Sequence, residues 1–135
     1  MKPAQYWLPW DTSIQPRVAF VLSQEEFDAV FRDAGSTEKT SWISGLNAAV
    51  NATTTWTTDC DGIPFYVVSL VPKPGVAGLK IAALLVHEAV HVFQYHCEYL
   101  GETAPSKEFE AYSIQFIAQA LMQKYADRLE FDSLV

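Results

Sequence analysis

The chain has 135 residues, 50% of them hydrophobic, and carries a formal net charge of −7 at pH 7 with a sequence pI near 4.8. This length and apolar content suit one core, so we predict a single domain over residues 1–135, with an extended arm at 1–16 and a tail at 129–135. The acidic balance argues against nucleic-acid or anionic-membrane partners. The sequence has no secretory signal and no apolar run of membrane-spanning length, which predicts a cytoplasmic protein.

The arm is rich in aromatic residues and proline. Tyr6, Trp7 and Trp10 lie among three prolines, a composition that disfavours a regular element. We expect these aromatic side chains to cover the core; the alternative is that they line a binding groove.

The next segment predicts a strand followed by a helix. Residues 17–22 form a continuous apolar run rich in β-formers. Ser23 can cap a helix over residues 24–34, and Gly35 can end it. The helix places three hydrophobic residues on one side: Phe27, Val30 and Phe31.

A hairpin is predicted in the middle of the chain. Residues 42–50 suit a short helix or an irregular link, and the threonine-rich residues 52–58 suit a strand. Residues 59–62 have turn chemistry, and residues 63–71 form the second strand. Pro64 near its start indicates either the beginning of a strand or a strand at the edge of the sheet.

The motif His87-Glu88-Ala89-Val90-His91 lies in an apolar segment that predicts a helix over about residues 79–99. Two histidines four residues apart fall on one face of a helix, where both imidazoles can reach one tetrahedral metal ion. Glu88 beside them can act on a water molecule at that metal. His96 falls nearly opposite the pair and is not expected to be a ligand.

A catalytic zinc site needs a third protein ligand, and the last predicted helix, over about residues 106–128, offers Glu108 and Glu110. Glu108 shares its side with a polar stripe: Gln115, Gln119 and Gln123. Glu110 shares its side with an apolar stripe: Ile114, Ile117 and Leu121. A buried carboxylate is costly unless it is paired or binds a metal, so burial favours Glu110, with Glu108 as the alternative.

The HExxH motif followed on a second helix by Glu110-Ala111-Tyr112 resembles the gluzincins, metallopeptidases whose zinc is held by His, His and Glu. It is also similar to small metallopeptidase-like proteins encoded in bacterial and phage genomes. The resemblance covers about residues 63–121. It implies a minimal zincin-like α+β fold, in which a sheet of about three strands and an N-terminal helix are followed by two antiparallel zinc-bearing helices.

The resemblance also implies a chemistry. Zn²⁺ would be bound by His87, His91 and Glu110, and Glu88 would serve as general base in hydrolysis of a peptide or protein substrate. Tyr112, or alternatively Tyr95, is the candidate to stabilise the oxyanion. The chain departs from the gluzincin pattern in one respect: several families have an Asp four residues after the zinc Glu to orient a histidine, and Ile114 occupies that position here. A backbone carbonyl or a carboxylate such as Asp59 or Asp61 would then orient the histidines. An edge strand before the motif helix could hold an extended peptide.

A second hypothesis assigns the zinc site to a structural or protein-interaction module that derives from a peptidase and cleaves nothing. The small size of the domain favours it, because little chain is left to form a wall for a substrate cleft. Cys60 and Cys97 are expected to be free and buried.

Overall fold

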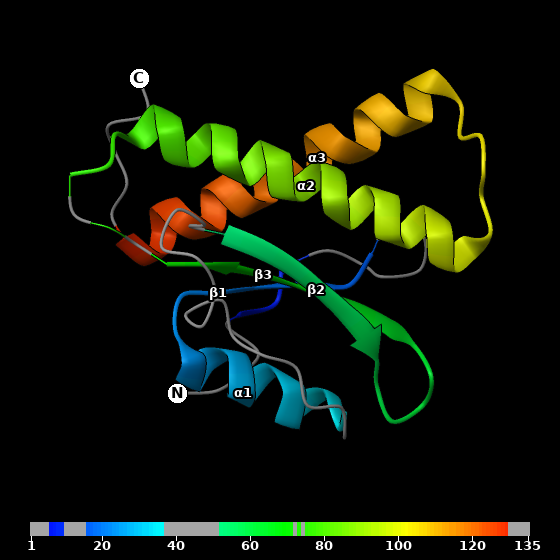
Figure 1. The fold of residues 1–135 in the computed structure, drawn as a ribbon, viewed down its shortest axis with the longest axis horizontal. Coiled ribbons are helices and arrows are strands. Elements are labelled where there is room, and N and C mark those ends of the chain that lie inside the picture. The colour runs from blue at the N-terminus through cyan, green and yellow to red at the C-terminus, as the bar shows by residue number, and fades with distance from the viewer. Residues whose placement is uncertain (1–5, 10–15, 37–51, 72, 74, 130–135) are drawn as a thin grey trace. The chain divides into compact units, whose positions relative to one another are not determined.

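The computed structural model describes residues 6–9, 16–36, 52–71, 73 and 75–129 (Figure 1). In these residues the elements are β1 (Val18–Val21), α1 (Gln24–Ala34), β2 (Ala52–Thr58), β3 (Pro64–Leu70), α2 (Gly78–Leu100) and α3 (Lys107–Leu129). They form an α+β fold with a three-stranded sheet and three helices, as the sequence predicted, and the sheet is mixed. The chain divides into two compact units, Met1–Lys73 and Pro74–Val135.

The sheet of the first unit has the strand order β1-β3-β2. β1 runs parallel to β3, with Val18 opposite Tyr66, and β2 runs antiparallel to it, with Thr58 opposite Pro64. β3 is therefore the central strand, and the expectation of an edge strand before α2 is wrong. Pro64 is tolerated because it is the first residue of the strand.

All seven residues of β3 are buried, which is the pattern of a strand covered on both faces. The pairing that makes β3 central joins it to β1, from which it is separated by α1 and β2 in the sequence. Local patterns do not report such a distant pairing. A peptide cannot be added as a new strand at β3, since its backbone is already paired on both sides along Tyr66–Ser69.

The turn between β2 and β3 is built around Asp59. Its Oδ1 accepts hydrogen bonds from the backbone N–H groups of Asp61 at 2.8 Å and Ile63 at 3.0 Å. Its Oδ2 pairs with the Arg17 guanidinium at 3.0 Å. The pKa of Asp59 is lowered, chiefly by the N–H of Ile63, and the charge of Arg17 acts in the same direction.

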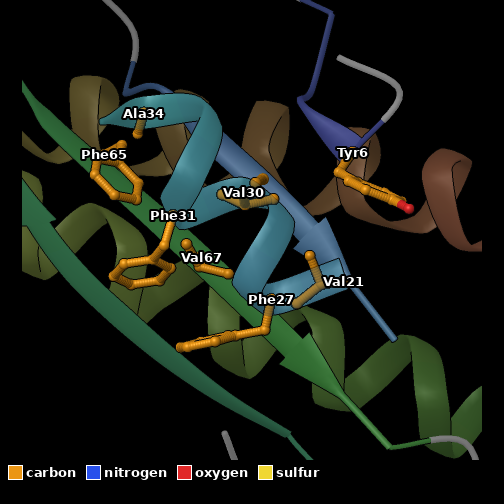
Figure 2. Packing of buried hydrophobic residues seen from close by; sticks show 9 residues of the cluster. Tyr6, Val21, Phe27, Val30, Phe31, Ala34, Phe65 and Val67 are labelled. Carbon is orange, nitrogen blue, oxygen red and sulfur yellow. The ribbon is translucent and has the colours of Figure 1, made fainter. Parts of the chain in front are cut away.

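Helix α1 begins and ends where the sequence predicted. Ser23 Oγ accepts from the backbone N–H of Glu26 at 3.2 Å, and Gly35 ends the helix with a left-handed φ of 69°. The apolar side of α1 belongs to a buried cluster with residues from β1 and β3 (Figure 2). In it, Phe31 stacks on Phe27 at 4.7 Å and meets the Phe65 ring edge-on at 5.3 Å.

The described part of the N-terminal arm covers this core. Tyr6 is buried in the same cluster (Figure 2). The Trp7 ring packs against this cluster and lies edge-on to Phe65 at 5.8 Å. Trp7 also bridges to β1 at Ala19. The prediction for these two aromatics is confirmed, whereas Trp10 and residues 42–50 lie outside the described residues.

The second unit contains α2 and α3. α2 ends at Gly101, whose N–H donates to the Glu98 carbonyl at 3.2 Å. Before α3, Ser106 Oγ accepts from the N–H of Phe109 at 3.2 Å. Figure 1 shows α3 (orange to red) doubling back across α2, and the Phe93 and Phe109 rings are 5.7 Å apart. Among the described residues, neither of these helices nor α1 combines the length and apolar character needed to cross a membrane.

Candidate metal centre

The centre of the site is a pair of histidine rings on α2. His87 Nε2 and His91 Nε2 are 3.1 Å apart, and the two rings are inclined at 77° to each other. With a zinc–nitrogen distance of about 2 Å, one ion bound to both atoms would have an N–Zn–N angle of about 100°, close to the tetrahedral value. The helical spacing therefore brings two imidazole nitrogens to a chelating distance.

His91 is held by the residues that follow it on α2. Its Nδ1 lies 3.0 Å from Gln94 Oε1, and the Tyr95 ring lies nearly parallel to the imidazole, at 21° with centroids 6.1 Å apart. Gln94 is three residues beyond His91, so both project from neighbouring positions of one helix face. This amide is the hydrogen-bond partner that our sequence interpretation missed, although the spacing of three residues was a usable signal.

Asp59 and Asp61, the carboxylates considered from the sequence as partners that orient the histidines, belong to the first unit, and this role stays a prediction. Asp59 Oδ1 accepts the two backbone hydrogen bonds within the hairpin turn, its Oδ2 pairs with Arg17 just before β1, and Asp61 is an exposed residue of the turn. The sequence could not show that the turn itself uses the Asp59 carboxylate.

Glu88 occupies a different environment from the histidine that precedes it. It is 3% exposed and belongs to the buried side of α2, whereas His87 is exposed and His91 is partly exposed. One residue corresponds to a rotation of about 100° around a helix, so Glu88 flanks the histidine pair. The carboxylate is thus placed at the boundary between the histidine face and the interior.

Helix α3 approaches the other flank of α2. Phe93 packs against Phe109, and the neighbouring turn of α2 carries Cys97, a buried thiol. Burial raises the pKa of Cys97, and the negative charges of Glu102 and Glu110 raise it further. Cys97 is six residues, or about 9 Å along the helix axis, beyond His91.

The argument that favoured Glu110 as third ligand assumed that its side chain is buried, and this is wrong. Ile117 and Leu121 on the same stripe are buried, but Glu110 is exposed, because it lies in the first turn of α3 where the cover ends. Glu108 is exposed as well, on the polar side as predicted. In the part of the chain that the structure describes, no third His, Cys, Asp or Glu joins the pair in a metal-binding group. The assignment of Glu110 stays a prediction.

The remaining candidates have distinct placements. Tyr112 is 58% exposed on α3, and its role stays a prediction, while Tyr95 is the tyrosine that contacts His91. His96 is partly buried, and burial lowers its pKa. Cys60 and Cys97 are both free, as expected, but Cys60 is exposed rather than buried because it stands in the hairpin turn.

The site is therefore defined by three residues of one helical turn, His87, Glu88 and His91, together with Gln94 in the next turn. Comparison of the chain with protein-family models, with curated proteins and with solved structures gives no match.

Proposed function

We propose that the protein is a zinc-dependent peptidase in which His87, His91 and Glu110 bind Zn²⁺ and Glu88 is the general base. The observation that carries the proposal is the separation of 3.1 Å between His87 Nε2 and His91 Nε2. Glu88, the residue that follows His87, supplies a carboxylate beside this pair.

The donor set suits zinc. Two imidazole nitrogens and one carboxylate form a common set of protein ligands for catalytic zinc, and they leave a fourth position for water or substrate. Glu110 comes from the helix that packs against α2, and its exposed side chain at the start of α3 is free of close packing. Glu108 in the same turn is also exposed, so exposure does not choose between the two, and Glu108 is the alternative. Glu110 is proposed because Glu110-Ala111 matches the Glu-Ala context of the gluzincin resemblance.

The residues of the chain have separate roles in hydrolysis. A bound Zn²⁺ supplies Lewis acidity, which polarises a peptide carbonyl and acidifies water. Glu88 accepts the proton of the attacking water as the carbon–oxygen bond forms, and delivers it to the amine nitrogen as the carbon–nitrogen bond breaks. Tyr112 donates a hydrogen bond to the oxyanion from its phenol. The substrate is a peptide or a protein segment.

The zinc content of the purified protein tests the ligand set. We expect about one zinc ion per chain in the wild type and in Glu108→Ala, and a loss of zinc in Glu110→Ala. These two variants are matched, because both remove an exposed glutamate from the first turn of α3. Loss of zinc in Glu108→Ala alone would transfer the role to Glu108, and a wild type that binds no zinc would contradict the proposal.

Cleavage of a mixture of unstructured peptides tests the reaction. Glu88→Gln should retain zinc but lose activity by about 10²-fold or more, because the amide cannot accept the proton of water. Cleavage products are identified by mass spectrometry, so no substrate sequence needs to be assumed. Zinc binding without Glu88-dependent cleavage would instead favour the non-catalytic zinc-binding module.

A further inference from the structure

We propose that Gln94 is a positioning residue for His91: its amide oxygen keeps the imidazole proton on Nδ1 and leaves the lone pair of Nε2 available to a metal ion. This inference rests on the proposed zinc site, whose ligands it concerns. The observation behind it is the contact of 3.0 Å between His91 Nδ1 and Gln94 Oε1.

The chemistry of the contact determines which nitrogen carries the proton. An amide oxygen can only accept a hydrogen bond, so the Nδ1 atom that faces it must be the donor. A neutral imidazole has one N–H group, and its other nitrogen is then unprotonated. Gln94 thus selects the tautomer whose Nε2 points its lone pair towards His87 Nε2.

The same contact orders the histidine pair when no metal is bound. With His91 Nε2 as acceptor, the approach of 3.1 Å is a hydrogen bond in which His87 Nε2–H is the donor. His87 is exposed, so it can exchange this proton with water and take the Nδ1–H form. Metal binding then replaces one bridging proton, while His91 keeps the tautomer that Gln94 selects.

Tyr95 supports the orientation of the ring from one face. Its ring is nearly parallel to that of His91, at 21°. Gln94 therefore restrains His91 at Nδ1, and Tyr95 restrains one face of its ring. Among the described residues, the hydrogen-bond and ring contacts of His87 are with His91. Loss of a hydrogen-bond partner behind a metal-binding histidine typically costs about 10–100-fold in metal affinity.

The first test reads the tautomer directly and needs no metal. The protein is labelled with ¹⁵N-histidine, and long-range ¹H–¹⁵N correlation spectra of the metal-free wild type and Gln94→Leu are compared. We expect His91 to be protonated at Nδ1 in the wild type and to lose this preference in Gln94→Leu. Protonation of His91 at Nε2 in the wild type would overturn the inference whether or not the protein binds zinc.

The second test measures zinc affinity by competition with a chromophoric chelator. Gln94→Leu should weaken binding by about 10–100-fold, and Gln94→Glu should restore it, because a carboxylate oxygen accepts the same hydrogen bond. Gln123→Leu is the matched control, since Gln123 also makes a side-chain hydrogen bond on an exposed helix face, to Asp127 at 2.9 Å. It should bind zinc like the wild type.

The outcomes separate the two proposals. Equal zinc affinity in wild type and Gln94→Leu, with both proteins helical by circular dichroism, would overturn the role of Gln94 and leave the zinc site standing. Absence of zinc binding in the wild type would contradict the proposed function, and the tautomer measurement would then decide the inference alone. Failure of Gln94→Glu to restore affinity would show that Gln94→Leu acts through packing, which also overturns the inference.

Discussion

The Asp59 carboxylate shows how one side chain can hold a turn through its charge. It accepts two backbone hydrogen bonds and pairs with Arg17, and its pKa is lowered, most strongly by the N–H of Ile63. A carboxyl group with a lower pKa in the folded state stabilises the fold above its unfolded pKa, near 4. That contribution is lost as the pH falls through the lowered, folded-state pKa.

The substitution Asp59→Asn should therefore reduce the free energy of unfolding at pH 7 by about 1 kcal/mol, because neutral hydrogen bonds replace charge-assisted ones. The difference from the wild type should shrink as the pH falls below about 4, because Asp59 of the unfolded wild-type chain becomes protonated there, and it should be lost once the pH has passed the lowered pKa of the folded state. Urea unfolding between pH 7 and pH 3 measures it. Asp61→Asn, in the same turn, serves as control, and a difference that does not change with pH would contradict the role of the charge.

At the scale of single residues, the sequence predicts what depends on local spacing. The histidine pair follows from the spacing of four residues on a helix. Gln94 was within reach of the same reasoning, but a glutamine on a polar face has many possible partners. The burial of Glu110 was predicted wrongly. A stripe of apolar residues shows which side of a helix faces inward, but it does not show at which residue of the helix the packing against neighbouring elements ends.

At the scale of elements, helix and strand boundaries follow closely from capping and turn residues. The clearest example is α1, which Ser23 begins and Gly35 ends, as predicted. Gly35 has a second constraint that the sequence does not reveal. A Cβ atom added there would lie 3.1 Å from Cys60 Sγ, a residue of the hairpin turn. The end of α1 is therefore fixed both by backbone conformation and by contact with a distant segment.

We expect Gly35→Ala to cost more stability than Gly62→Ala. Both glycines have positive φ, 69° and 80°, so each substitution should cost about 1–2 kcal/mol from backbone strain. Only Gly35 also crowds a neighbour, whereas nothing lies within 4 Å of the added atom at Gly62. Urea unfolding of the two variants measures the difference, and equal losses would show that Cys60 moves aside at no cost.

At the scale of the whole molecule, the sequence predicts the α+β class and the order of elements along the chain but not the order of strands in the sheet. The hairpin of β2 and β3 joins neighbouring segments and was predicted. The parallel pairing of β1 with β3 is non-local, and it turns the expected edge strand into the central one. The packing of α3 against α2 could also be expected, because a short turn joins the two helices. The point along α2 that Glu110 of α3 reaches depends on non-local contacts and could not be predicted.

Hydrogen exchange can test the position of β3. The backbone amides of Tyr66–Ser69 have paired strands on both sides and should exchange more slowly than those of β2. In β2, only the amides that face β3 are paired within the described sheet, so protection should alternate along Ala52–Thr58. Residue-resolved exchange by NMR provides the measurement. Alternating protection along β3 itself would mean that it lies at an edge after all.

Both histidines of the candidate site come from one short stretch of α2. This part of the site could therefore be transferred to another protein as a single segment. The separation of its nitrogens is a property of helical geometry and of the contact with Gln94, so the sequence from His87 to Gln94 could be transplanted onto an exposed helix of another protein. The carboxylate proposed to complete the site belongs to a separate helix and would not travel with it. Such a graft would bind a metal ion through the two histidines but would not hydrolyse peptides. It would thus separate metal binding from peptide hydrolysis, which the native chain is proposed to combine.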